Sequence, residues 1–324
     1  METDLRLTEL TLEITNACHH RGVHCSTVGG LPSENELTQD DRLRVLREAC
    51  QLGLNELRLL GGDPLFRLRD TIELLEEANR LSVERALICT SAVEHRLEWL
   101  RTLSAITPIQ ISAEASIYSA SSSVHDQITL RPGSLERLLV NSREAVRVGF
   151  ELNWNFVWMK PNFYDLDSVV RLASEMGIKR VRILRLMLNG RARENRAALE
   201  LTRDLEMQCE SIIACSAERF PRVRLAFSKP LAFLLHRDSR NGVASCSAGE
   251  GQLVVQADGG VVPCIGMKDM PQFEVGNVRT GSIREILART RRLNLPQRSR
   301  EFAECPAIIF QKRPELTHLT MRRT

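Results

Sequence analysis

The chain has 324 residues, of which 43% are hydrophobic and 26% are charged, proportions typical of a folded, water-soluble protein. No stretch approaches the roughly 18 consecutive apolar residues of a membrane helix, and the N-terminus shows no secretory signal, so we expect a cytoplasmic protein without a membrane partner. The net charge of +3 is spread over scattered arginines, which favours a solvated surface over a nucleic-acid site.

Strand and helix patterns alternate along the chain. Period-two alternation and β-prone residues predict strands at 9–16, 57–60, 86–90, 108–114, 152–159 and 181–186. Apolar residues at helical spacing predict helices at 38–53, 71–81, 94–103, 135–148, 166–176 and 202–216. Thr38 with Asp41 is close to a capping box, and Gly53, Gly149 and Gly177 are expected to end their helices.

This alternation predicts the fold class, α/β. Repeated strand–helix units require a parallel sheet, and six strands are fewer than the eight of a closed barrel, so we expect a partial (β/α)6 barrel over residues 1–237. The segment 238–242 (DSRNG) reads as a linker. Short strands at 253–256 and 261–262 around an Asp-Gly-Gly turn, then a helix at 283–293, predict a small β-hairpin and helix extension over 238–324.

The nine cysteines fall into two sets. Four lie inside apolar helix or strand patterns and are expected to be buried thiols: Cys50, Cys89, Cys209 and Cys215. Five lie in predicted loops beside glycine, histidine or proline: Cys18, Cys25, Cys246, Cys264 and Cys305. Because disulfides are rare in cytoplasmic chains of this size, ligation of a metal or cluster is the better interpretation of the second set.

The loop after the first strand reads CHHRGVHC, from Cys18 to Cys25. It resembles the CxxxCxxC motif of the radical S-adenosylmethionine (radical SAM) enzymes, whose core is a (β/α)6 partial barrel. In that family three thiolates hold a [4Fe–4S] cluster, and the fourth iron binds SAM. By this resemblance Cys18 and Cys25 are cluster ligands, and His24 matches a ring-bearing residue that lies near the adenine. Gly22 stands at the position of the middle cysteine and cannot ligate iron.

Three interpretations of Gly22 stay open. The chain is an enzyme in which a ligand has been replaced, naturally or for study, with activity lost or weakened. Alternatively, His19 or His20 fills the vacant ligand position, as histidine does in some clusters. Alternatively, the chain is a non-catalytic relative that binds SAM, a partner or a metal, the last through a tetrahedral zinc site of four side chains. The members of that zinc set would be Cys18, Cys25, His24 and His20.

A second motif, Gly61-Gly62-Asp63-Pro64, follows the second strand and resembles the GGEP motif of the family. The resemblance implies that it meets the amino group of SAM. Glycines permit close backbone approach, and a carboxylate suits an ammonium group. Without that context, the same residues would indicate only a turn.

A third run resembles the ISLDG…HD..RG..GS pattern of radical SAM enzymes that carry a C-terminal SPASM or twitch domain. Ser112 and Glu114 are expected to end the fourth strand, and Arg131 follows His125-Asp126. The resemblance implies contacts of Ser112, Glu114 and Arg131 with the SAM ribose and carboxylate. Alternatively, Asp126 and Arg131 brace a loop. Further polar residues fit the same pattern: Asn155, Asn162 and Gly190-Arg191.

The C-terminal cysteines match the CX9–15GX4C signature that opens SPASM and twitch domains, with Cys246, Gly259 and Cys264 at the required spacing. Cys305 follows, but the next expected ligand position is occupied by Ile308. The three thiols predict at most one auxiliary iron–sulfur cluster. Alternatively, they are buried thiols of a hairpin that has lost its cluster.

The resemblance implies reductive cleavage of SAM and abstraction of a hydrogen atom from a substrate, with electrons from a flavodoxin- or ferredoxin-type reductant. Since the first strand begins near residue 9, we expect no N-terminal peptide-recognition domain and favour a small polar substrate, such as a sugar or aminocyclitol on an antibiotic-like pathway. A peptide-modifying maturase and a non-catalytic SAM- or metal-binding protein are the alternatives. The pattern assigns no catalytic side chain.

Overall fold

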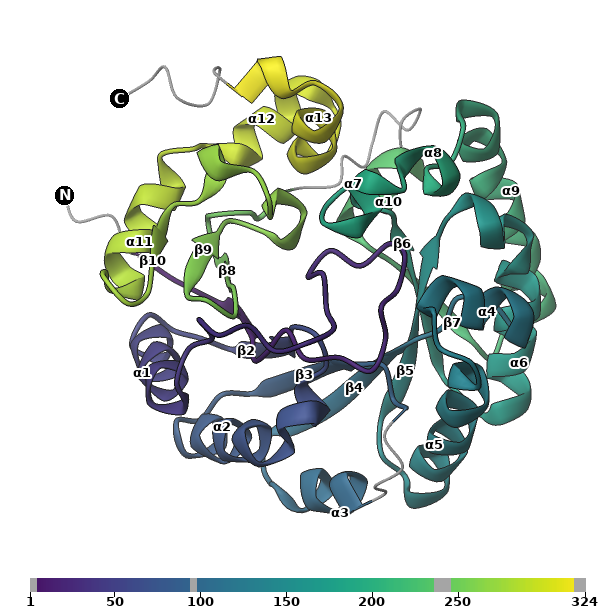
Figure 1. Cartoon of the computed structure of the whole chain (residues 1–324), viewed down its shortest axis with the longest axis horizontal. Coiled ribbons are helices and arrows are strands. Elements are labelled where there is room, and N and C mark those ends of the chain that lie inside the picture. Colours follow the sequence, from purple (N-terminus) through teal and green to yellow (C-terminus); the bar gives the residue numbers. More distant parts are fainter. Residues whose placement is uncertain (1–4, 94–97, 236–245, 318–324) are drawn as a thin grey trace.

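A computed structural model describes residues 5–93, 98–235 and 246–317 of the chain (Figure 1). Its strands are β1 Glu9–Glu13, β2 Glu56–Leu60, β3 Arg85–Thr90, β4 Gln110–Ser116, β5 Leu152–Trp158, β6 Arg180–Arg185, β7 Arg224–Phe227, β8 Gln252–Val255, β9 Gly260–Val262 and β10 Gly276–Asn277. Its α-helices are α1 Gln39–Cys50, α2 Leu68–Arg80, α3 Glu98–Ala105, α4 Ser122–Thr129, α5 Ser134–Val148, α6 Leu166–Met176, α7 Arg191–Glu194, α8 Arg196–Leu199, α9 Arg203–Arg219, α10 Lys229–Leu235, α11 Ile283–Arg291, α12 Leu295–Phe302 and α13 Pro306–Lys312. Short 3-10 helices span Pro64–Arg67, Lys160–Asp165, Ile265–Met267, Pro271–Phe273 and Pro314–Thr317.

The described strands form one ten-stranded sheet in the order β10-β9-β8-β1-β2-β3-β4-β5-β6-β7. Strands β1 to β7 pair in parallel with their neighbours, which confirms the predicted α/β fold with an open, partial barrel. Helices α1, α2, α3, α5, α6 and α9 surround the outer face of the sheet (Figure 1). Because these strands are parallel, their carboxyl ends lie at the same edge of the sheet. Ligand-binding loops lie at this edge in such folds.

The C-terminal hairpin is part of the same sheet. β8 pairs in parallel with β1, with Glu9 opposite Gln252, and β9 pairs with β8 in the antiparallel sense. Figure 1 shows β8 and β9 beside the purple N-terminal segment, with α11 to their left and α12 and α13 above them. The predicted hairpin is confirmed, but β7 was not predicted, because four residues are too few for a clear alternation. The expected linker at 238–242 and the boundary at 237–238 lie outside the described residues.

Alternation along each strand separates the two faces of the sheet. In β1, Leu10 and Leu12 are fully buried in the main core against the helices, whereas Thr11 and Glu13 point to the opposite face. A second apolar cluster lies under the C-terminal helices and includes Met267, Phe273 and Phe310. None of the helices in the described parts of the chain has the length and apolar character needed to cross a bilayer.

Several local predictions are confirmed in detail. Thr38 caps α1, and its side chain and that of Asp41 form the reciprocal capping box. Gly149 and Gly177 end α5 and α6 in the left-handed conformation, with φ of +77° and +78°. Strand β4 is displaced from its predicted bounds, because it ends two residues beyond Glu114.

Candidate functional site

The site is built on the loop that leaves β1. Gly29 lies between its two cysteines: the Gly29 amide donates to Cys25 Sγ at 3.4 Å, and a β-carbon on Gly29 would come within 3.1 Å of Cys18 Cβ. The same point on Gly29 is 3.4 Å from Gly62 Cα. The fold therefore brings the two predicted ligands together, next to the glycine pair that follows β2.

Helix α4 and the segment after it hold the outer side of this loop. The Val23 amide donates to the Ile128 carbonyl at 2.9 Å, and the Arg21 amide donates to the Thr129 carbonyl at 3.1 Å. Arg131 Nη1 donates to the His19 carbonyl at 3.2 Å. Arg131 therefore makes a loop-bracing contact, the alternative to the contact with SAM that the resemblance implies.

Arg191, at the start of α7, holds the inner side of the loop. Its Nε donates to the Gly22 carbonyl at 2.9 Å, and its Nη2 donates to the Gly29 carbonyl at 3.0 Å. Its backbone amide also donates to the Cys25 carbonyl at 3.1 Å. The sequence indicated Gly190-Arg191 only as part of a weak pattern, because no local signal reveals that a guanidinium will reach two carbonyls more than 160 residues away.

Burial sets the protonation of the side chains in the loop. Burial, with Asp63 adding to it, raises the pKa of Cys18 to about 12. Burial also lowers the pKa of His20 to about 3 and of His24 to about 4, with neighbouring cationic groups contributing. The imidazoles of His20 and His24 are therefore neutral at pH 7, and the Cys18 thiol is protonated.

The zinc interpretation is not supported. Among the described residues, no three His, Cys, Asp or Glu side chains are close enough to share one metal ion. Cys18, Cys25, His20 and His24 therefore do not form the tetrahedral set that zinc requires.

The glycine pair lies directly against the cysteine loop. A β-carbon on Gly61 would come within 2.4 Å of the Thr15 carbonyl oxygen, and one on Gly62 within 2.2 Å of the Ala17 carbonyl oxygen. The Gly62 amide donates to Thr15 O, and the Asp63 amide to Ala17 O at 2.8 Å. Only glycine allows this approach of two backbones.

The Asp63 carboxylate is 1% exposed and has several donors of its own. Oδ1 accepts from the Leu65 amide and Thr90 Oγ1, and Oδ2 accepts from Thr90 Oγ1 and from the Ser91 amide and hydroxyl. Pro64 begins the 3-10 helix that Asp63 caps. A contact of this carboxylate with the SAM ammonium stays a prediction. In such a contact, the ammonium would share the two Asp63 oxygens with the hydrogen bonds that they already accept.

Ser112 and Glu114 do not end β4, as was expected; they lie inside it, because β4 continues to Ser116. Glu114 is 2% exposed and forms ion pairs with Arg180 at 3.5 Å and Arg182 at 3.4 Å. The Asn155 side-chain amide also donates to Glu114 Oε2 at 2.9 Å. These residues join strands β4, β5 and β6 through a polar network on the inner face of the sheet.

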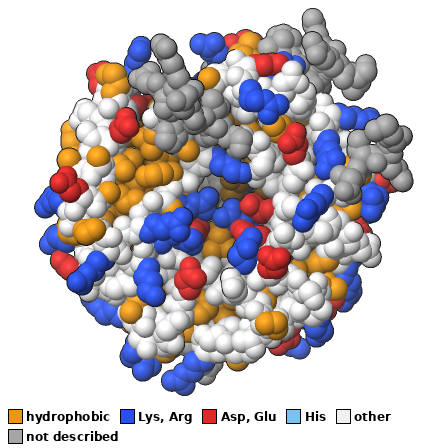
Figure 2. Space-filling model, turned by 180° about the vertical axis from the view of Figure 1, so that it is seen from behind, with side chains coloured by type: hydrophobic (Ala, Val, Ile, Leu, Met, Phe, Trp, Pro, Cys, Tyr) orange, Lys and Arg blue, Asp and Glu red, His pale blue; other side chains and the backbone are white. Residues whose placement is uncertain are grey.

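The face of the molecule opposite to the view of Figure 1 carries interspersed charges. Figure 2 shows basic and acidic side chains gathered around a hollow near the middle of this face. Arg58 pairs with Glu9 at 3.3 Å and with Glu56 at 3.1 Å, and all three lie in the first two strands. Charges of both signs cancel locally, in keeping with the small net charge of the chain.

The three C-terminal cysteines are brought together from distant positions. Each packs against the second apolar cluster, and burial raises the pKa of all three thiols. Cys246 and Cys305 both raise the pKa of Cys264 further, in keeping with the packing of all three against the same apolar cluster. Ile308 lies in α13 one turn after Cys305 and supplies no ligand atom.

The two sets of donors fit iron–sulfur clusters to different degrees. The C-terminal segment offers three thiols in apolar surroundings, but within residues 246–317 no three side chains are arranged to share one metal ion, so the auxiliary cluster stays a prediction. The first loop offers two thiols where the family uses three, and Gly22 has no side chain to complete the set. The first loop therefore does not fit a three-thiolate cluster as it stands.

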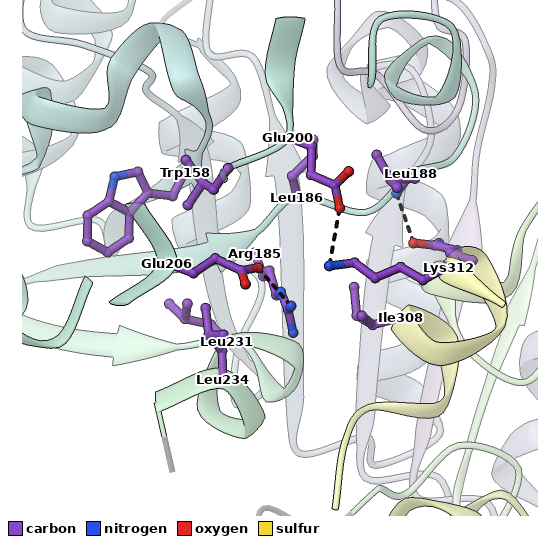
Figure 3. A pocket seen from close by; sticks show the side chains of 12 residues that line it. Trp158, Arg185, Leu186, Leu188, Glu200, Glu206, Leu231, Leu234, Ile308 and Lys312 are labelled. Carbon is purple, nitrogen blue, oxygen red and sulfur yellow. Dashed lines mark hydrogen bonds and ion pairs between the residues drawn. The ribbon is translucent and has the colours of Figure 1, made fainter. Parts of the chain in front are cut away.

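A pocket lies between the end of the barrel and α13, the helix that follows Cys305 (Figure 3). Its apolar lining includes Leu186, just after β6, Leu231 of α10 and Ile308 of α13. Its charges are paired: Arg185 bonds Glu206 at 3.0 Å, and Lys312 bonds Glu200 at 3.3 Å. The sequence patterns did not indicate this pocket, because its walls come from distant segments.

Two family models match the chain. Residues 12–172 match the model described as "Radical SAM superfamily", and residues 246–307 match SPASM, described as "Iron-sulfur cluster-binding domain". A curated relative, the PqqA peptide cyclase of Rhizobium meliloti (strain 1021), is 27% identical over 281 residues, which cover 85% of this chain and 72% of the relative.

Solved structures share the fold. Streptococcus suis SuiB bound to its precursor peptide SuiA superposes with a TM-score of 0.71 at 17% identity, covering 87% of this chain and 64% of SuiB. The protein anSMEcpe with bound AdoMet superposes with a TM-score of 0.68 at 14% identity, covering 92% of this chain and 88% of that one. The chain thus spans somewhat less than two thirds of SuiB.

Proposed function

Because the chain belongs to the radical SAM superfamily of enzymes and carries an iron–sulfur cluster-binding domain of the SPASM type, we propose that it modifies a peptide substrate. The cofactors of this family are SAM and iron–sulfur clusters. The observation that supports a peptide substrate is the alignment, over 85% of the chain, with a relative named as a peptide cyclase. It favours the peptide alternative over the sugar or aminocyclitol that the sequence analysis preferred.

The cluster of this family, when bound, supplies the electron that cleaves SAM to a 5′-deoxyadenosyl radical. Because Gly22 leaves the first loop one thiolate short, we assign no step of that chemistry to this loop. The roles of the chain's own residues are narrower. Cys18 and Cys25 offer thiolates, the Gly61-Gly62 backbone borders the same space, and α4 and Arg191 hold the loop in shape.

The partners follow from the same proposal. The substrate is a peptide, and a small reductant protein of the flavodoxin or ferredoxin type would supply electrons.

Gly22 favours a second candidate, a SAM-binding protein without radical chemistry. In that case the fold would bind SAM next to Gly61 and Gly62, but no 5′-deoxyadenosine would form.

The experiment uses the anaerobically reconstituted chain and its Gly22→Cys variant with SAM and dithionite. One set of reactions contains short synthetic peptides of ribosomal type, and the other contains sugars and aminocyclitols. We expect the peptides to stimulate 5′-deoxyadenosine formation and to change in mass. Stimulation by the sugar set alone would overturn the peptide proposal. SAM binding without 5′-deoxyadenosine from either protein would support the second candidate.

A further inference from the structure

A buried ion pair joins the C-terminal segment to the first strand. Lys268 Nζ lies 2.5 Å from Glu13 Oε1, and the two side chains are only 4% and 2% exposed. The ammonium group also donates to Thr27 Oγ1 at 3.2 Å, and the Thr27 hydroxyl is 3.4 Å from the same Glu13 oxygen. Three segments that are distant in the sequence therefore meet at one carboxylate oxygen.

The place of this contact in the chain is informative. Glu13 is the last residue of β1, five positions before Cys18, and Thr27 follows Cys25 by two positions. Lys268 follows Cys264 by four positions, just after the 3-10 helix Ile265–Met267. The ion pair thus links the segment that carries one set of cysteines to the loop that carries the other.

Stability alone does not account for such a contact. Removing two charges from water is costly, and a buried ion pair is on average no more stabilising than apolar residues of the same size. The ammonium group, which has three donors, can however bond Glu13 and Thr27 at the same time and so tie the three segments together.

The neighbouring contacts support the same interpretation. The Gly190 amide donates to Asp269 Oδ2 at 2.6 Å, and the Asn189 side chain donates to the Ile265 carbonyl at 2.8 Å. Arg191, next in sequence, holds the carbonyls of Gly22 and Gly29. The loop after β6 is therefore bonded to both cysteine-bearing segments, and Lys268 closes the remaining side of this junction.

We propose that Lys268 is a positioning residue, which holds the Cys18–Cys25 loop in register with the C-terminal cysteines through Glu13 and Thr27. The inference rests on the proposed function for its purpose, which is to keep the two cluster sites at a set separation around a substrate. The contacts of Lys268 do not depend on that function, so the test below needs neither a substrate nor a measurement of enzyme activity.

The test measures alkylation of individual cysteines by iodoacetamide, read by mass spectrometry, in the full chain freed of iron under reducing conditions. Lys268→Met is expected to raise the alkylation rates of Cys18 and Cys25 by about tenfold or more, because the loop loses its anchor. The rate of Cys209, which is buried in α9 and far from the junction in sequence, is expected to stay at the wild-type value. A double variant, Glu13→Gln with Lys268→Met, removes the unpaired buried carboxylate.

A purely structural role predicts a different result. The double variant would then restore both the melting temperature and the protection of Cys18 and Cys25. A positioning role predicts that the melting temperature recovers while Cys18 and Cys25 stay reactive. The reason is that the bond from the Lys268 ammonium group to Thr27 is still missing. If Lys268→Met does not fold, the double variant alone decides between these outcomes.

Glu304→Gln serves as a matched control. Glu304 pairs with Arg185 at 3.2 Å, with side chains 11% and 7% exposed, and also joins the C-terminal segment to the barrel, but at β6. It is expected to lower the melting temperature without changing the rates of Cys18 and Cys25. Wild-type rates of these cysteines in both Lys268 variants, or an equal increase in Glu304→Gln, would overturn the proposal.

Discussion

The ring of His24 faces Gly22: its Cε1 and Nδ1 atoms lie 3.4 and 3.6 Å from the point where a β-carbon on Gly22 would stand. Apart from its two chain neighbours, the only other atom of the described residues within 3.5 Å of that point is the carbonyl oxygen of Ile128. These are ordinary van der Waals distances, and the backbone of Gly22 does not require a left-handed conformation. The loop therefore keeps room for a β-carbon at the position where the family places its middle cysteine.

This room leads to the first prediction. Gly22→Cys is expected to fold like the wild type and to bind about four more irons per chain after anaerobic reconstitution, because the third thiolate completes the set. Iron and sulfide assays with the ultraviolet–visible spectrum measure the change. Gly22→Ala is the matched control, since it adds the β-carbon without the sulfur and should leave iron content unchanged. Equal iron content in all three proteins would contradict our assignment of the loop.

The second prediction concerns the contact of the glycine pair with the loop. A β-carbon on Gly62 would lie 2.2 and 2.5 Å from the carbonyl oxygens of Ala17 and Asn16, so Gly62→Ala must push the two backbones apart. We expect the melting temperature to fall by about 4 °C or more and SAM binding to weaken. Differential scanning fluorimetry and equilibrium dialysis measure these changes. Gly30→Ala, whose β-carbon would meet only a flexible side-chain atom at 3.9 Å, should stay close to wild type in both.

The third prediction concerns Asp126, which braces the turn between α4 and α5. Burial alone would raise its pKa, but hydrogen bonds from the Leu135 amide, Ser134 and the Gly133 amide outweigh burial and lower the pKa. A lowered folded-state pKa stabilises the fold above the unfolded value of about 3.9, and this stabilisation disappears as the pH falls through the folded value.

Asp126→Asn is therefore expected to reduce the free energy of unfolding by about 1–3 kcal/mol at pH 7, and the difference from wild type should shrink below about pH 4. Urea denaturation of both proteins across this range measures it. Asp40→Asn, an exposed aspartate in the first turn of α1, is the control and should show a much smaller difference. A difference that grows on acidification would show that the sign of the coupling is wrong.

The fourth prediction concerns the C-terminal cysteines. If Cys246, Cys264 and Cys305 hold an auxiliary cluster, Cys264→Ser should remove most of the iron that wild type binds after reconstitution. Cys215, exposed on α9, provides the control, because Cys215→Ser should leave the iron content unchanged. Equal iron content in the two variants would favour buried thiols over a cluster.

Much of the fold was predictable from local patterns. The alternation of β1, the capping box of Thr38 and Asp41 and the left-handed Gly149 at the end of α5 follow from interactions within a few residues. Such signals are carried by short windows of sequence. The cysteine spacing and the Gly-Gly pair were likewise local, which is why the family resemblance was visible before any contact was known.

Other features depend on contacts that no short window contains. The placement of Ser112 and Glu114 inside β4 was missed, because the strand is extended by its pairing with β5 rather than by its own alternation. The parallel pairing of β8 with β1 joins residues more than 240 positions apart. Arg191 was indicated only weakly, since the carbonyls that it holds belong to another loop.

By itself the sequence determined the alternation of β1, the cap of α1, the glycine ends of α5 and α6, and the lack of a thiol at position 22, because these depend on side-chain chemistry and near neighbours. Only the tertiary structure decided that Arg191 holds the loop around Gly22 and that Lys268 reaches Glu13 across 255 residues. The physical reason is that such pairings arise when the folded sheet brings remote segments together, and a hydrogen bond or ion pair leaves no periodic trace in either segment.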